Sequence, residues 1–178
     1  MSALAVPVSA DDHIQGNPGA PVTLVEYGDF QCPACAMAYP LVKAIQQRHG
    51  DDLAFVFRHF PLAEVHQYAK LAAEVAEGAD AQGRFWDMHD WLYENQDGWV
   101  AEGVEGLEAG LRALSLDEGR VAGAAQSPAV AARIHRDFMG GVRSGVNGTP
   151  SFYLNGARFE GDFEDLQAVI DEVIAQTR

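Results

Sequence analysis

The chain has 178 residues, of which 48% are hydrophobic and 21% charged, and its formal net charge is −14. This length suits one well-buried domain or a small domain with a large insertion, and the composition excludes disorder over most of the chain. The negative charge argues against nucleic acid or an anionic membrane as the main partner.

The first regular elements follow a polar N-terminal segment. Residues 1–20 are polar, with Gly and Pro near their end, and are interpreted as an extended arm and a turn. Residues 22–27 (VTLVEY) are rich in β-branched and aromatic side chains, which is typical of a strand. Apolar residues then recur at helical spacing over 33–49, and 53–57 (LAFVF) reads as a second strand. The order strand, helix, strand predicts a βαβ unit with parallel pairing.

A helical block comes next in the chain. Ala, Leu, Glu and Gln dominate residues 63–144, and the spacing of the apolar residues predicts at least four helices. Ser127-Pro128 is a candidate break between two of them. This block would form a lid, a substrate-binding face or simply more packed core.

The C-terminal part returns to β-structure. Residues 151–154 and 157–160, joined by Asn155-Gly156, carry the clearest hairpin pattern in the chain. An amphipathic helix follows Gly161-Asp162 and runs toward the C-terminus.

The two cysteines carry the sharpest chemical pattern. Cys32 and Cys35 form a CxxC motif after a strand and a short turn, at the point where a helix begins. The free N–H groups and the dipole of a helix N-terminus favour a thiolate, which is the nucleophilic form. Cys32 is therefore the candidate that attacks a substrate disulfide, and Pro33 suits the first helical position. Cys35, one turn further in, is the candidate that attacks the mixed disulfide.

Zinc binding and coincidence are the alternatives for this pair. A zinc site needs three or four protein ligands, and the chain has no further Cys and no His pair at metal-ligand spacing. We therefore expect no metal and no cofactor.

Two further features lie where redox chemistry would need them. Glu26 is an acid within an apolar strand, six residues before Cys32. In a strand buried on both faces its pKa would be raised, and it would exchange a proton with Cys35; on an edge strand it would face solvent. Thr149-Pro150 lies between a Gly-rich turn and a strand, where a proline often marks a bend or a cis bond.

Four motifs in order resemble the DsbA-like branch of the thioredoxin superfamily. They are residues 22–35 (VTLVEYGDFQCPAC), 58–62 (RHFPL), 85–90 (FWDMHD) and 145–152 (GVNGTPSF). The resemblance covers most of the chain. It implies a thioredoxin fold, an α/β fold whose mixed sheet is flanked by helices, formed by 21–62 and 145–178, with residues 63–144 as an inserted all-helical domain.

The resemblance also assigns roles. It implies that Cys32 is the nucleophile, that Cys35 is the resolving thiol and that Glu26 is the buried acid of such folds. It implies that Thr149-Pro150 is a cis-proline loop that faces the cysteines across the substrate groove, which we take Pro33 and Ala34 to border from the cysteine side. Strongly oxidising relatives carry a His where this chain has Ala34, so a less oxidising protein is expected.

We therefore expect an enzyme, a thiol–disulfide oxidoreductase that acts on protein substrates bearing thiols or disulfides. Its redox partner would be a second protein or a low-molecular-weight thiol, and no nucleic acid or membrane is expected to bind. A disulfide isomerase and a chaperone-like binding module on the same fold are the alternatives. Glutathione-dependent transferases with a related fold generally lack the second cysteine.

The N-terminus has no basic stretch followed by an apolar run, which predicts a cytoplasmic protein. A trimmed signal peptide would make it periplasmic or extracellular. In a reducing cytosol the pair would act as a reductase.

Overall fold

One mixed sheet organises the computed structural model, which describes residues 2–178. Its strand order is β1-β3-β2-β4-β5, with β2 and β3 parallel and the other pairs antiparallel. The strands are β1 (His13–Gly16), β2 (Val22–Gly28), β3 (Leu53–His59), β4 (Ser151–Leu154) and β5 (Ala157–Arg158). The predicted βαβ unit is confirmed, and so is the hairpin, although its second strand ends at Arg158 and not at residue 160.

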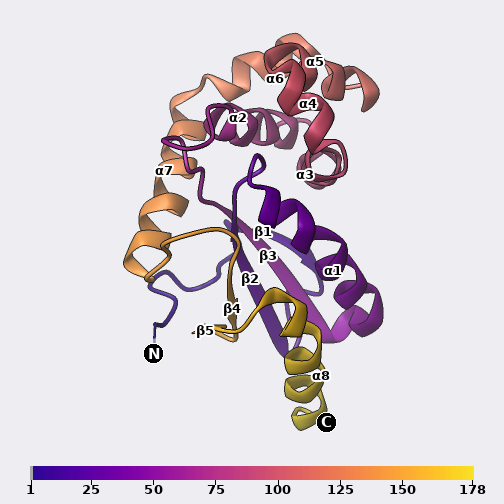
Figure 1. Ribbon diagram of the computed structural model, residues 1–178, viewed down its shortest axis with the longest axis vertical. Coiled ribbons are helices and arrows are strands. Elements are labelled where there is room, and N and C mark those ends of the chain that lie inside the picture. Colours follow the sequence, from indigo (N-terminus) through magenta and orange to yellow (C-terminus); the bar gives the residue numbers. More distant parts are fainter. Residues whose placement is uncertain (1) are drawn as a thin grey trace.

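The helices divide into those along the sheet and those between β3 and β4. The α-helices are α1 (Pro33–His49), α2 (Ala69–Asp80), α3 (Phe85–Glu94), α4 (Gln96–Glu102), α5 (Val104–Ala113), α6 (Glu118–Ala125), α7 (Pro128–Arg143) and α8 (Leu166–Gln176). Short 3-10 turns, η1 (Gly50–Asp52) and η2 (Phe163–Asp165), precede β3 and α8. Figure 1 shows α2 to α6 gathered at one end of the sheet, with α7 leading back along one side. The predicted α/β fold with a helical insertion is confirmed.

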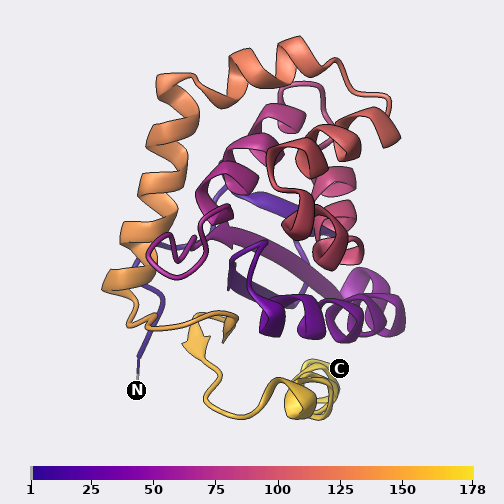
Figure 2. The same cartoon turned by 45° about the horizontal axis from the view of Figure 1, so that its top comes forward.

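The two faces of the sheet have separate cores, because side chains alternate along a strand. On one face Leu24 and Phe55 belong to the large core that α1, the insertion and α8 complete. On the other face Val25 and Tyr153 belong to a smaller core, against which Phe138 of α7 packs. Figure 2 shows α7 on the side of the molecule away from α8. Both faces of β2 and β3 are therefore covered, which explains their continuous apolar runs.

Local chemistry explains the boundaries of two elements. Ser127 caps α7, because its side-chain oxygen accepts a hydrogen bond from the Val130 amide, and Pro128 starts the helix. The predicted break at this point is confirmed. Asn155 and Gly156 both have positive φ, 49° and 84°, as the tight turn of a two-residue hairpin requires.

Two elements differ from the sequence analysis. β1 lies within the segment interpreted as an extended arm and pairs with β3, from His13 opposite Phe57 to Gly16 opposite Ala54. Helix α4 was not predicted separately. The domain boundaries at residues 62/63 and 144/145 stay a prediction. Among residues 2–178 no helix combines the length and the apolarity that crossing a bilayer requires.

Candidate active site

The two cysteines lie at the N-terminus of α1, which follows β2 after a four-residue turn. Cys32 is the N-cap residue and Pro33 is the first helical residue. Two hydrogen bonds within the turn stabilise it. The Cys32 amide donates to the Asp29 carbonyl at 3.1 Å, and the Gln31 amide donates to the Asp29 side chain at 2.8 Å. Asp29 is 2% exposed, so the carboxylate that shapes this turn is part of the interior.

The loop before β4 covers Cys32. The Cys32 sulfur lies 3.5 Å from the carbonyl oxygen of Thr149, to which the thiol donates, and the Thr149–Pro150 peptide bond is cis. Cys32 is 6% exposed and Cys35 is not exposed at all. Pro33 is exposed and Ala34 half-buried between them. The structure thus brings together the predicted cysteines and the predicted proline loop, with Cys32 the more accessible sulfur.

The two thiols have opposite pKa shifts. The neighbouring Cys35 thiol lowers the pKa of Cys32 to about 6, and the side chain of Thr149 and the backbone amides of Cys35 and Ala34 add to this effect against the cost of burial. Burial raises the pKa of Cys35 well above its usual value, and its hydrogen bond to Cys32 and the charge of Glu26 raise it further. One sulfur is therefore ready as a thiolate while the other holds its proton.

Glu26 lies in the middle of the sheet and is 3% exposed. The alternative of a solvent-facing acid on an edge strand is wrong, since β2 has β3 on one side and β4 on the other. Burial, together with the charge of Cys32, raises the pKa of Glu26 to about 8. Glu26 shares the sheet face of Leu24, which packs in the same core as Cys35. A carboxyl group with a pKa near neutrality thus lies on the face of the sheet where Cys35 packs.

Gln96 is a functional candidate that the sequence analysis missed. Its side-chain amide donates to the Phe30 carbonyl at 2.8 Å and to the Cys32 carbonyl at 2.9 Å, and it is 8% exposed. The first residue of α4 therefore supports the turn that carries Cys32. A cavity of about 510 Å³ opens beside it, lined by Ala36 of α1 and by residues of α3 to α5.

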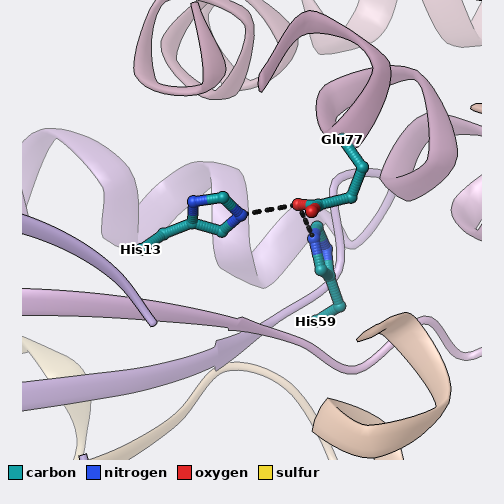
Figure 3. Close-up of side chains that lie close together, drawn as sticks. All are labelled: His13, His59 and Glu77. Carbon is teal, nitrogen blue, oxygen red and sulfur yellow. Dashed lines mark hydrogen bonds and ion pairs between the residues drawn. The ribbon is translucent and has the colours of Figure 1, made fainter. Parts of the chain in front are cut away.

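A second group of buried ionisable side chains lies away from the cysteines. Figure 3 shows His13 of β1 and His59 of β3 pointing at the Glu77 carboxylate of α2. Their Nε2 atoms lie 2.6 and 2.8 Å from the same carboxylate oxygen, and Arg133 of α7 lies 3.1 Å from the other oxygen. The cluster therefore ties the sheet to α2 and α7.

Residues of this kind also bind metals, since His, His and Glu are ligands that zinc uses. The ligand atoms of His13, His59 and Glu77 all lie within 4.8 Å of one another. However, the carboxylate already has two imidazole hydrogen-bond partners and an ion pair with Arg133, and the Nδ1 atom of His59 has no hydrogen-bond partner among residues 2–178. A metal-binding histidine normally donates its second N–H to an acceptor. The arrangement fits a hydrogen-bonded cluster better than a metal centre.

The sequence matches a known family and several curated proteins. A sequence model described as thioredoxin matches residues 9–172. The chain is 43% identical over 178 residues to the Na(+)/H(+) antiporter NhaA 1 of Salinispora arenicola, covering 98% of this chain and 27% of that protein. It is 38% identical over 156 residues to the Na(+)/H(+) antiporter NhaA 1 of Mycolicibacterium gilvum, covering 86% and 25%. The chain thus spans about a quarter of the length of these relatives.

Solved structures with the same fold cover nearly the whole chain. A thioredoxin-like oxidoreductase from Silicibacter pomeroyi superposes with a TM-score of 0.79 at 26% identity, over 96% of this chain and 95% of that one. The α-DsbA1 protein of Wolbachia pipientis gives a TM-score of 0.83 at 19% identity, over 97% and 95%. BdbD of Bacillus subtilis gives 0.80 at 23% identity, over 98% and 100%. The last two similarities concern the fold alone.

Proposed function

The chain belongs to the thioredoxin family, and from this premise we propose that it is a protein thiol–disulfide oxidoreductase with Cys32 as nucleophile and Cys35 as resolving thiol. The observation that carries the proposal is the pair of opposite pKa shifts at the N-terminus of α1. A lowered pKa makes Cys32 a thiolate at neutral pH, and its exposure exceeds that of Cys35. A structural pair would need neither property.

The proposed exchange has two steps. The Cys32 thiolate attacks a client disulfide, a Cys32–client bond forms, and the other client sulfur leaves as a thiolate that takes a proton from solvent. In the mixed disulfide Cys32 no longer carries the charge that helps to raise the pKa of Glu26. The ionised form of Glu26 then takes the proton of Cys35, and the Cys35 sulfur attacks Cys32. The Cys32–Cys35 bond forms while the Cys32–client bond breaks, so the client is reduced by two electrons and the enzyme is oxidised. Running in reverse, the same steps oxidise a client dithiol.

The loop at Thr149 and Pro150 is proposed to hold the client, together with Pro33 and Ala34. The Thr149 carbonyl oxygen lies 3.5 Å from the Cys32 sulfur, so this loop lies where a client chain would reach the sulfur. Clients are proteins bearing thiols or disulfides. The direction of exchange follows the redox potential of the compartment and of the partner, a protein or a small thiol. The cytoplasmic location predicted from the sequence stays a prediction.

Trapping variants test this proposal. Cys35→Ser should accumulate a mixed disulfide between Cys32 and a disulfide-bonded client such as insulin, and Cys32→Ser should form none and lose turnover. Turnover by Cys32→Ser at the wild-type rate would overturn the proposal. Refolding of a scrambled client separates the alternatives, since an isomerase restores its native disulfides and a binding module retains the client after both cysteines are replaced.

The similarity to antiporters supports a second proposal, about the setting of this activity. Because 98% of the chain matches one part of a Na(+)/H(+) antiporter at 43% identity, we propose that this redox module works fused or bound to a transporter of that class. Mixed disulfides trapped by Cys35→Ser in membranes of the source cells should then contain such an antiporter. Trapping of other proteins alone would contradict this setting.

A further inference from the structure

The Tyr93 hydroxyl is a buried polar group that the two exchange steps leave unused. Tyr93 lies on α3 and is 5% exposed. Its ring packs against Phe30 and Tyr39, with ring centroids 5.2 and 5.6 Å apart. Its oxygen has no hydrogen-bond partner in the part of the chain that the structure describes, residues 2–178. Packing therefore explains the ring but not the hydroxyl.

This hydroxyl has a cost that phenylalanine would avoid. A buried polar group without a partner destabilises a folded protein, because its hydrogen bonds to water are lost on folding and are not replaced. Native proteins pair nearly all such groups, and the exceptions often have a catalytic or redox role. A Phe at position 93 would keep the same ring contacts without this cost. The hydroxyl therefore indicates a hydrogen bond that forms in another state of the protein.

The surroundings of the hydroxyl indicate which function. Its oxygen lies 3.0 Å from the position that a Cβ on Gly28 would take. Cys35 and Tyr93 belong to the same buried cluster, together with Phe57, whose ring also lies against that Gly28 position. Glu26 lies two residues before Gly28, on the same face of β2. The hydroxyl thus lies beside the end of β2, the strand that carries the proposed proton acceptor, and in the same core as the resolving sulfur.

The hydroxyl remains a donor in this environment. Burial raises the pKa of Tyr93 well above its usual value, and negative charge on Cys35 or Glu26 raises it further. The same electrostatic coupling means that a proton held by Tyr93 stabilises a thiolate formed at Cys35. Such a thiolate forms only while the mixed disulfide is being resolved, so the hydroxyl gains its partner only during the reaction.

We propose that the Tyr93 hydroxyl donates a hydrogen bond to the Cys35 thiolate as this sulfur attacks the mixed disulfide. The inference rests on the proposed function and adds a residue from the helical insertion to it. Cys35 gives its proton to Glu26, its sulfur bonds to Cys32, and the client sulfur leaves with the electron pair of the broken bond. Tyr93 keeps its proton throughout. It stabilises charge on the attacking sulfur and transfers nothing.

Tyr93→Phe tests this role, because it removes one oxygen and keeps the ring. Wild-type and variant dithiol proteins are mixed with a fluorescent disulfide peptide, and acid-quenched samples are analysed for the mixed disulfide over a range of pH. The first step should be unchanged, and resolution should slow about tenfold or more, as loss of a hydrogen bond to a charged group implies. The urea midpoint should stay the same or rise.

Tyr153→Phe is the matched control. Its hydroxyl donates to the Ser144 carbonyl at 2.7 Å, and its ring lies in the core on the other face of the sheet. This variant should lose stability and keep both exchange rates. Resolution by Tyr93→Phe at the wild-type rate, or equal slowing of both steps, would overturn the inference. Absence of any mixed disulfide in Cys35→Ser would instead overturn the proposed function.

Discussion

Replacing Glu26 by Gln tests the central electrostatic feature of the site. Burial raises the pKa of this carboxyl from 4.5 to about 8. An acid with a raised pKa binds its proton more tightly in the folded state, so stability falls as the pH rises from the unfolded pKa to the folded one. Gln has nearly the same shape and no charge to desolvate. Glu26→Gln should therefore stabilise the protein above the unfolded pKa and do little below it.

The expected size follows from the same numbers. At pH 7, about 2.5 pH units above the unfolded pKa, the raised pKa of Glu26 lowers the free energy of unfolding of the wild type by roughly 3 kcal/mol, at 1.36 kcal/mol per unit. This is an upper limit for Glu26→Gln, since the Gln amide is itself a buried polar group. The gain should be larger in the reduced protein than in the oxidised one, because the Cys32 thiolate adds to the shift.

Urea denaturation of the reduced and oxidised proteins at pH 4 and pH 7 measures this difference. Glu108→Gln is the control, since Glu108 is exposed and its replacement should change little at either pH. Equal unfolding free energies for the wild type and Glu26→Gln at both values would refute the reasoning. The variant should also resolve mixed disulfides more slowly, because Cys35 loses its proton acceptor.

Three further predictions concern other contacts. Alkylation of Cys32 should speed up with pH around a midpoint near pH 6, where its lowered pKa lies; a midpoint near the usual 9 would contradict this. Gln96→Ala should shift that midpoint and lower the free energy of unfolding by about 1–3 kcal/mol. Gln82→Ala is its control, since it removes a less buried side-chain amide that also donates to a carbonyl, and it should leave the midpoint unchanged. Glu77→Ala should lower the free energy of unfolding, measured by urea denaturation, by about 3–5 kcal/mol, because it removes the carboxylate that pairs with His13 and His59. The pH dependence of Cys32 alkylation should stay unchanged. Destabilisation by less than about 1 kcal/mol would mean that this cluster does not hold the sheet to α2 and α7.

The central part of the site could be predicted because its pattern is local. The strand before Cys32, the helix after Cys35 and the hairpin at Asn155-Gly156 each depend on residues close in sequence. Their helical and β-patterns agree with the chemistry they carry, and this consistency is what makes a local prediction reliable. Hence the βαβ unit, the break between two helices at Ser127-Pro128 and the hairpin at Asn155-Gly156 were predicted without the structure.

The missed features depend on tertiary contacts. β1 has four residues with only one β-branched side chain, and pairing with β3 makes it a strand. Helix α4 begins at Gln96 and contains Gly98, so its local helical pattern is weak. Gln96 and Tyr93 stand more than fifty positions from the cysteines, in a block that reads as packed helices. Only the folded chain brings their polar atoms to the active-site turn.

Two buried glutamates show how this fold separates stability from chemistry. Glu26 and Glu77 are 3% and 5% exposed, and burial pushes the pKa of each carboxyl upward. For Glu77 the hydrogen bonds from His13 and His59 outweigh burial and lower its pKa, so its charge is paired and holds β1, β3 and α2 together. Among residues 2–178 no cation offsets the burial of Glu26, and its pKa stays high. The paired acid can only stabilise, whereas the unpaired one can gain and lose a proton near neutral pH, as the role of resolving thiol proposed for Cys35 requires.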